Sequence, residues 1–428
     1  MNEATASPAE SRVWWRSEGL LAVFVVTVVS LPDFSLMVPE PLLTVADISL
    51  HPMDVVALAA AILGVWRMIR TRKLGVESGA VAVLWLLLAV EVLRGAMIFG
   101  FQPSVNFGRV LFYGLAALTY AAWLPRRWSR RDLLGGVPAL LVILGLCLGR
   151  FLASGLLLRH DGDNADVLMV DLRPVSASGA FFLLAAAFIV VSGRTRSGTR
   201  SYIAAGALAL VVVLVQQRTV WFCIAAAVPA WIIASWLDVR EGVLVMPKRF
   251  LQGVTAIGVV VVGVLVTPSL RNSATDTSNL TWRFHQWGDG INAMPDAVAW
   301  IIGRPSASSR DQWDFSAYLN RVKITHGSGL TTHSTYVDLL LLVGLVGLAA
   351  VLVLIFRSAT RRYDRLWISS PGAVALIVAV VVYGVTYFLP VIAFALVGMA
   401  LAERIRQRPW SNGPLESGAA AASELTHG

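Results

Sequence analysis

Long, uninterrupted apolar blocks are the feature of this 428-residue sequence that most constrains its fold. The blocks run for 16 to 22 residues, which is the length that an α-helix needs to cross the hydrocarbon core of a bilayer. Only 14% of the residues are charged, whereas soluble domains have about 25%. The sequence therefore predicts an all-α, polytopic integral membrane protein.

The apolar blocks predict twelve transmembrane helices. The last two meet at Tyr387-Phe388-Leu389-Pro390 and could instead form one re-entrant pair. The predicted spans are 19–37, 52–69, 78–98, 105–124, 133–151, 172–192, 201–217, 219–237, 250–268, 334–356, 371–388 and 389–403. The resulting organisation is a bundle of spans 1–9 over residues 1–268, a loop over 269–332, spans 10–12 over 333–408, and a tail over 409–428. The tail is rich in Gly, Ser and Ala, and we expect it to be disordered and cytoplasmic.

The positions of Lys and Arg predict the orientation of the bundle. Alternate connections between the apolar blocks hold 23 of the 35 basic residues. The positive-inside rule places these connections and both termini in the cytoplasm. The same rule places the loop 269–332, the largest connection, on the outer surface of the membrane. Because topology accounts for the net charge of +9, nucleic acid is not expected as a partner.

The outer loop contains a segment with the apolar spacing of a surface helix. Its apolar residues recur at intervals of four, three, four and three, which predicts an amphipathic helix over 279–294. Such a helix would lie on the outer leaflet with its aromatic side toward the lipid. Arg283 flanks the stripe, and it could equally be an ordinary solvated arginine. The stripe consists of Leu280, Phe284, Trp287, Ile291 and Met294.

Arg218 lies between two apolar blocks that leave no room for a loop. A charge at that depth costs several kcal/mol unless it has a partner or lines a polar cavity. Its planar guanidinium can donate two parallel hydrogen bonds to a phosphate. Arg218 is therefore a candidate phosphate ligand, although an arginine here could also extend toward the lipid headgroups.

His333 stands at the beginning of the predicted tenth span, and Asp338 follows it inside the apolar block. A neutral imidazole at the membrane surface can accept a proton from a sugar hydroxyl near neutral pH. The alternative is a histidine that only hydrogen-bonds the backbone at a helix start. Asp338 could hold a neighbouring arginine or orient the site. Arg94 and Arg109 lie near predicted outer span ends, where they could line a polar crevice or extend to the headgroups.

Three stretches together resemble the O-antigen ligase and polymerase superfamily. Residues 333–348 run His-Ser-Thr-Tyr-Val-Asp and then Gly-Leu-Val-Gly-Leu, similar to the signature His-Asn-x-Tyr-Leu-Glu followed by Gly-Leu-x-Gly-Leu. The stretch 281–287, followed by Gly303, resembles the family's Arg-x-x-x-Trp segment. Gln217-Arg218-Thr219 resembles its buried arginine motif. Two departures are Ser334 in place of Asn, and Leu342 where many members have an acidic residue.

The resemblance implies a membrane glycosyltransferase of the bacterial cytoplasmic membrane that acts in polysaccharide biosynthesis for the cell envelope. The donor would be a glycan on undecaprenyl diphosphate, and the acceptor a hydroxyl of a glycan, a lipid or another molecule. His333 would be the base, Arg218 and Arg283 would bind the diphosphate, and the transfer would invert the anomeric centre without a metal or other cofactor. The possible supporting residues are Tyr336, Asp338, Trp287, Gln217, Arg94 and Arg109.

Other functions remain open at the level of the sequence. A ligase and a polymerase would use the same residues, so these motifs do not separate them. A lipid or glycan transporter would be expected to have inverted repeats and charges at the membrane midplane, whereas the charges here gather at the outer rim. A non-catalytic membrane scaffold would tolerate alanine at Arg218, Arg283 and His333.

Overall fold

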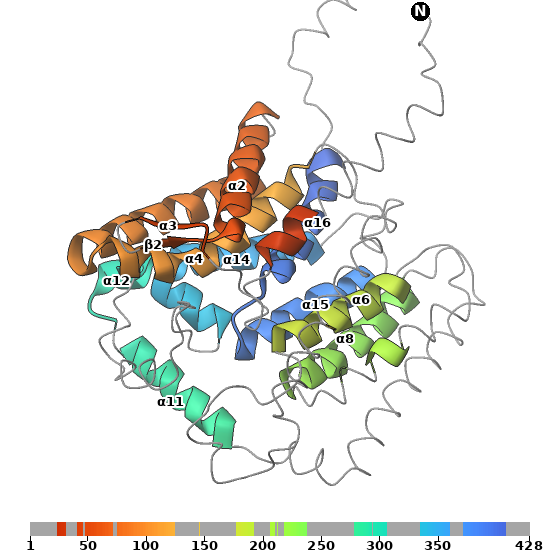
Figure 1. Ribbon diagram of the computed structural model, residues 1–428. Coiled ribbons are helices and arrows are strands. Elements are labelled where there is room, and N and C mark those ends of the chain that lie inside the picture. The colour runs from red at the N-terminus through yellow and green to blue at the C-terminus, as the bar shows by residue number, and fades with distance from the viewer. Residues whose placement is uncertain are drawn as a thin grey trace, which may run out of the picture.

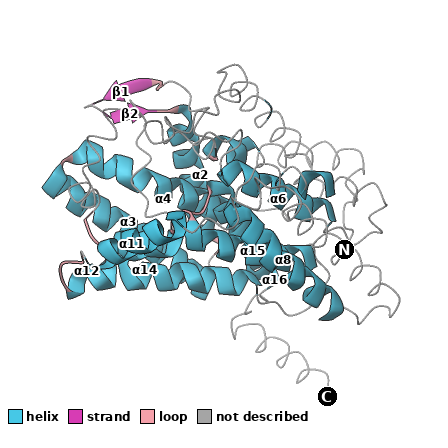
Figure 2. Ribbon diagram, turned by 90° about the horizontal axis from the view of Figure 1, so that it is seen from below, coloured by secondary structure: helices cyan, strands magenta, loops and turns pink. Residues whose placement is uncertain are grey.

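The computed structural model describes a mainly helical chain (Figures 1 and 2). It describes residues 24–30, 41–45, 48–71, 75–124, 145, 177–191, 206–209, 212, 218–237, 278–292, 294–305, 334–359 and 371–407. The helices are α2 (Pro52–Arg70), α3 (Val76–Phe99), α4 (Phe101–Ala122), α6 (Ala177–Val191), α8 (Arg218–Leu237), α11 (Ser278–Asn292), α12 (Ala297–Ile302), α14 (Thr335–Ala359), α15 (Pro371–Thr386) and α16 (Val391–Gln407).

Among the described residues, three helices are long and apolar enough to cross a membrane, namely α2, α3 and α14. Their outward faces expose large apolar side chains, including Ile62 and Trp66 of α2, Leu86 and Leu93 of α3, and Phe356 of α14. Extended exposed apolar surface is unusual in a soluble protein and is typical of helices that contact lipid. The prediction of a helical protein with apolar spans is confirmed to this extent.

The twelve-span layout as a whole stays a prediction. Helices α2, α3, α4, α6, α8, α14, α15 and α16 overlap predicted spans. The apolar parts of α6, α8, α15 and α16 are shorter than a full crossing. The predicted spans 133–151 and 250–268 lie outside the described residues, apart from Gly145. The first and seventh predicted spans are described only in part.

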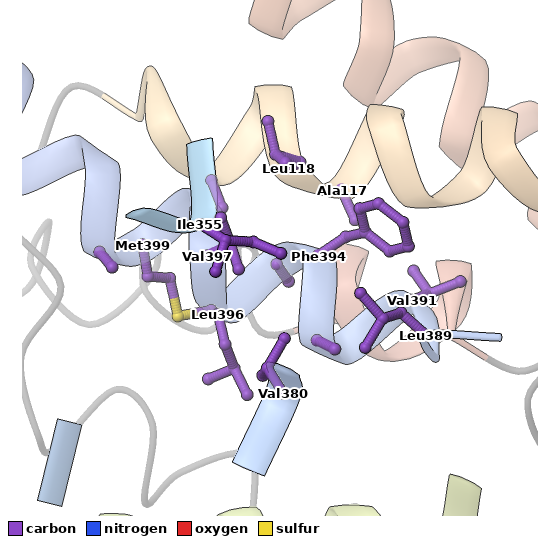
Figure 3. Close-up of a cluster of buried hydrophobic side chains, with 14 of the residues drawn as sticks. Ala117, Leu118, Ile355, Val380, Leu389, Val391, Phe394, Leu396, Val397 and Met399 are labelled. Atoms are coloured by element: carbon purple, nitrogen blue, oxygen red, sulfur yellow. The ribbon is translucent and has the colours of Figure 1, made fainter. Parts of the chain in front are cut away.

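The helices form two groups that α14 joins (Figure 1). In one group α4 packs against α2, α3 and α16, and in the other α15 packs against α8 and α6. The contact between α4 and α16 is very close, because a Cβ added at Gly398 would lie 2.4 Å from the carbonyl oxygen of Leu118. Figure 3 shows Phe394 and Val397 of α16 packed beside Ala117 and Leu118 of α4.

A two-stranded antiparallel sheet precedes α2, so the prediction of a wholly helical chain is wrong there. Strand β1 (Leu43–Val45) pairs with β2 (Ile48–Leu50), and Leu43 lies opposite Leu50. These short runs alternate apolar and hydroxyl side chains and contain β-branched residues, which favours extended backbone. From the sequence, this stretch is only a connection between the first two predicted spans.

The short helix α12 packs its end against an interruption in α14. Gly344 has a φ of 65° and breaks the helical conformation of α14, while Gly303 caps α12 with a φ of 104°. A Cβ added at Gly303 would lie 2.3 Å from the carbonyl oxygen of Leu342, and one at Gly344 would lie 2.3 Å from that of Ile301. Both the positive φ and the close backbone approach require glycine.

We predict that Gly344→Ala and Gly303→Ala each lower the free energy of unfolding by at least about 2 kcal/mol, because a left-handed φ alone costs about 1–2 kcal/mol and the new Cβ would also strike a backbone carbonyl. Unfolding of the purified protein in mixed detergent measures the change. Gly79→Ala is the matched control, since a Cβ there meets nothing within 4 Å. Equal stability of all three variants would contradict the prediction.

Candidate functional site

The turn formed by residues 386–390 joins α15 to α16 and receives the beginning of α14. The backbone amide of Thr335 donates to the carbonyl oxygen of Tyr387 at 3.2 Å. The Thr335 hydroxyl donates to the same carbonyl oxygen at 2.8 Å and accepts from the amide of Leu389 at 2.7 Å. The buried Thr335 therefore holds the start of α14 to this turn.

The residues on either side of Thr335 strengthen the attachment to α15. The Ser334 hydroxyl donates to the carbonyl oxygen of Gly384 at 3.5 Å, and the Tyr336 hydroxyl donates to that of Val381 at 2.7 Å. Tyr336, a predicted supporting residue, thus has a structural contact. His333, the predicted base, directly precedes Ser334 and lies outside the described residues.

Arg283 reaches the same turn from α11. One of its terminal nitrogens, Nη1, donates to the carbonyl oxygen of Thr386, and its Cζ lies 4.6 Å from the centre of the Tyr387 ring. A guanidinium over an aromatic face is held by attraction to the ring's negative π cloud. Arg283 is only 7% exposed, so the alternative of a freely solvated arginine is not what the structure shows.

The beginning of α8 completes the convergence on this turn. The Thr386 hydroxyl donates to the Thr219 hydroxyl at 2.8 Å. Thr219 follows Arg218, which is the first residue of α8, and Gln217 lies outside the described residues. Three segments therefore meet at residues 386–390. Two of them contain the motifs around Arg218 and Arg283, and the third directly follows His333.

Helix α11 confirms the helix predicted over 279–294, although it ends at Asn292. Trp287 packs edge-on against Phe284 with ring centres 5.1 Å apart. Met294 lies beyond the helix and is buried in a small cluster with Ala299 and Leu341. The last residue of the predicted apolar stripe therefore contacts α12 and α14 instead of continuing the helix.

Asp338 lies one turn into α14, and its backbone amide donates to the carbonyl oxygen of Ser334 at 2.8 Å. It is partly buried near the motif that contains His333. The expected role of Asp338 stays a prediction.

Arg94 contacts α12 instead of the 386–390 turn. Its Nη1 lies 2.6 Å from a carboxylate oxygen of Glu91 and donates to the carbonyl oxygen of Gly303 at 3.3 Å. Glu91 is completely buried within α3. The neighbouring Arg304 is also buried. Arg94 therefore helps to attach the predicted outer loop to the helix bundle.

Arg109 belongs to a third cluster, which ties the small sheet to the helices. Its Nε lies 3.0 Å from a carboxylate oxygen of Asp54, and its Nη2 donates to the carbonyl oxygen of Ser49 at 2.8 Å. The Tyr113 hydroxyl donates to the same Asp54 oxygen at 2.5 Å. These contacts join β2, α2 and α4 and give Arg109 a structural role.

The chemical character of the region around the 386–390 turn is cationic and rich in hydroxyl groups. Arg283 supplies a positive charge, and Thr219, Thr335 and Thr386 supply hydroxyls. Within the described residues, no three or more His, Cys, Asp or Glu side chains group as they would around a metal ion. The arrangement suits the binding of an anion close to a buried helix start.

Comparison with known proteins adds no family assignment: no protein-family model matches this chain, and no curated protein matches it significantly.

The motifs meet through four residues that the sequence does not single out as site residues, namely Thr219, Thr335, Thr386 and Tyr387. Each contact pairs positions that are distant in the sequence, so no local spacing reveals it. The available signals were indirect. Thr219 and Thr335 stand beside residues already singled out, and Tyr387 follows the last apolar residues of a span.

We predict that Thr335→Val lowers the free energy of unfolding by about 1–3 kcal/mol, because it leaves the partly buried Tyr387 carbonyl and the buried Leu389 amide with fewer partners. Thr335→Ser keeps the hydroxyl and should lose much less. Detergent-mixture unfolding of both variants provides the measurement. If Val and Ser have the same effect, the hydroxyl is not what holds the turn.

Proposed function

We propose that this chain is a membrane glycosyltransferase that moves a glycan from undecaprenyl diphosphate to an acceptor hydroxyl, at the outer side of the bacterial cytoplasmic membrane. The observation that carries the proposal is the convergence of the start of α8, Arg283 of α11 and the start of α14 on residues 386–390. These are the segments in which the resemblance to O-antigen ligases and polymerases lies.

Stabilisation of the leaving diphosphate is the first chemical requirement. As the bond between the anomeric carbon and the diphosphate oxygen breaks, negative charge develops on that oxygen, and positioned cationic donors stabilise it. Arg283 meets this need, since its contacts with Tyr387 and Thr386 hold the guanidinium in one orientation before the donor arrives. Preorganised charge in a site with little water acts more strongly than the same charge in bulk water.

Arg218 would provide the second cationic group for the diphosphate. It is the first residue of α8, a helix that continues to Leu237. The N-terminus of a helix presents backbone N–H groups and the positive end of the helix dipole, both of which favour a phosphate. Thr219, bound to Thr386, places this helix start at the turn where Arg283 lies.

His333 would act as the general base. Ser334 and Thr335, the residues directly after it, are hydrogen-bonded to α15 and to the 386–390 turn. The acceptor oxygen would attack the anomeric carbon as the bond to the diphosphate breaks, and the acceptor proton would pass to the imidazole. Attack on the side opposite the diphosphate inverts the anomeric centre. Asp338, one turn later, and Trp287 and Tyr336 would support this geometry.

We expect His333→Ala to reduce turnover by about 10²–10⁴-fold, the usual contribution of general acid–base catalysis. Arg218→Ala and Arg283→Ala should each reduce it by about 10²–10³-fold, as expected when a donor to a developing negative charge is removed. The assay uses purified protein in vesicles with lipid-linked glycan extracted from the source cells. Electrophoresis of the glycan products gives the rate.

The pattern of glycan products in this assay distinguishes a ligase from a polymerase. Transfer of one finished block indicates a ligase, whereas a ladder of increasing lengths indicates a polymerase that uses the same site. The control is Asp289→Asn, which alters an exposed residue on α11 and should retain full activity. If folded His333→Ala, Arg218→Ala and Arg283→Ala proteins all remain active, the mechanism is wrong. Movement of the lipid-linked glycan without transfer would favour a transporter.

The ring beneath Arg283 gives a finer test. Tyr387→Phe keeps an aromatic face under the guanidinium, whereas Tyr387→Leu removes it. A buried cation–π contact is worth about 2 kcal/mol, so we expect Tyr387→Leu to lower turnover by about tenfold or more and Tyr387→Phe to retain most of it. Turnover in the vesicle assay, with unfolding midpoints measured in parallel, makes the comparison. Equal turnover of the two variants would show that the aromatic ring of Tyr387 is not needed to position Arg283.

A further inference from the structure

The segment Met294–Pro305, which contains α12, contacts helices α3 and α14 at positions away from their ends. Helices α3 and α14 are antiparallel, because Glu77 near the start of α3 lies 2.9 Å from Arg357 near the end of α14. The end of α3 and the start of α14 therefore lie on the same side of the bundle. This is the side at which α12 is attached.

Two independent contacts give the depth of α12. Arg94, which donates to Gly303, is five residues before the last residue of α3, or about 8 Å at 1.5 Å per residue. Gly344, which abuts Ile301, is nine residues after the first residue of α14, or about 13 Å. A bilayer core is about 30 Å thick, so both contacts lie within the stretch that would be surrounded by lipid.

The polar backbone at both ends of α12 has partners inside the protein. The Asp296 carboxylate accepts from the amide of Ala299 at 2.7 Å and caps the start of the helix. At the other end, the Gly303 amide donates to Ala299 at 2.8 Å, and the Arg304 amide donates to Leu341 at 2.7 Å. Irregular backbone is tolerated at membrane depth only when such groups are satisfied in this way.

The interruption of α14 leaves a backbone carbonyl that needs a hydrogen-bond donor from elsewhere in the protein. A helix that breaks at Gly344 no longer provides the regular amide partners for the carbonyls of the preceding turn. The Leu341 carbonyl lies in that turn, and the Arg304 amide supplies a donor to it. The two irregular segments therefore satisfy each other, which explains how α14 can be both apolar and broken.

The outward face of α12 is apolar and adjoins apolar faces of α3 and α14. Val298 is 54% exposed and Ile301 is 51% exposed, and Leu345, directly after Gly344, is 50% exposed. Met97 and Ile98, in the last turn of α3, are also exposed. Figures 1 and 2 both place α12 beside α14 and the adjacent end of α3.

We propose that Met294–Pro305 is a re-entrant membrane segment, in which Val298 and Ile301 contact the hydrocarbon chains of the lipid beside Leu345. Intramembrane charges are usually paired or turned toward the protein. The exposed Asp296 lies before the first residue of α12, where its carboxylate caps the helix. Arg94 is paired with Glu91, and Arg304 is buried. The observation that favours lipid as the occupant is the continuity of this face with the exposed apolar surfaces of α3 and α14, two helices long enough to span the membrane. The proposal does not depend on glycosyl transfer.

Spin-label depth measurements on the full chain in phosphatidylethanolamine–phosphatidylglycerol vesicles test the proposal. Single cysteines at Val298 and Ile301 are compared with one at Leu345 and one at the exposed Asp289, after Cys147 and Cys223 are replaced by alanine. Oxygen collects in hydrocarbon and a nickel chelate stays in water. We expect the oxygen-to-nickel collision ratio at Val298 and Ile301 to match that at Leu345 and to be several-fold above that at Asp289.

Two results would overturn the proposal. A ratio at Val298 and Ile301 equal to that at Asp289 would place α12 in water. Labels reached by neither reagent would mean that another protein or a second copy covers this face. As a second measurement, Val298→Lys should reduce the yield of folded protein several-fold more than Asn292→Lys, which alters the exposed end of α11. Equal yields would also argue against lipid contact.

Discussion

Every polar backbone group in an apolar helix bundle needs a partner inside the protein, because hydrocarbon provides none. Helix α14 shows how strongly this requirement shapes the chain. Its start is tied by Thr335 to the 386–390 turn, its interruption at Gly344 is completed by the amide of Arg304, and Arg357 near its end pairs with Glu77. These three attachments hold α14 between the two groups of helices. The candidate site lies at the first attachment, and its geometry therefore depends on the packing of the whole bundle.

The features that hydropathy and local spacing can predict are those that depend on neighbouring residues. The length of an apolar block determines whether it can cross a bilayer, so the ranges of α2, α3, α8 and α14 were predictable to within a few residues. The helix α11 was predictable because its apolar spacing follows the helical period. The choice of Arg218, Arg283 and the segment around His333 also followed from local context, namely charges or an imidazole beside apolar blocks.

Contacts between distant segments could not be predicted in the same way. Nothing near Arg283 indicates that its guanidinium would lie on Tyr387, and Glu91 within an apolar block gave no sign that its partner Arg94 would reach Gly303. The β1–β2 pair was missed because its strands are shorter than any window that detects a span. The depth of α12 was missed for another reason. Six apolar residues are too few to cross a membrane, so α12 could be recognised as embedded only after its contact with Gly344 was known.

The packing of α12 also bears on how the candidate site stays assembled. Only a few residues separate α11, which contains Arg283, from α12, and Met294 between them is buried against Leu341 of α14. If Arg283 were its only attachment, the loop would lose conformational entropy each time that it became ordered against the 386–390 turn. Attachment of α12 at Gly344 shortens the free chain between two fixed points, and a shorter loop costs less entropy to close. The start of α14 is fixed through Thr335, and the position of α11 is fixed through the contact of α12 with α14. Helix α14 therefore positions both Arg283, the proposed diphosphate ligand, and the segment that follows His333, the proposed base.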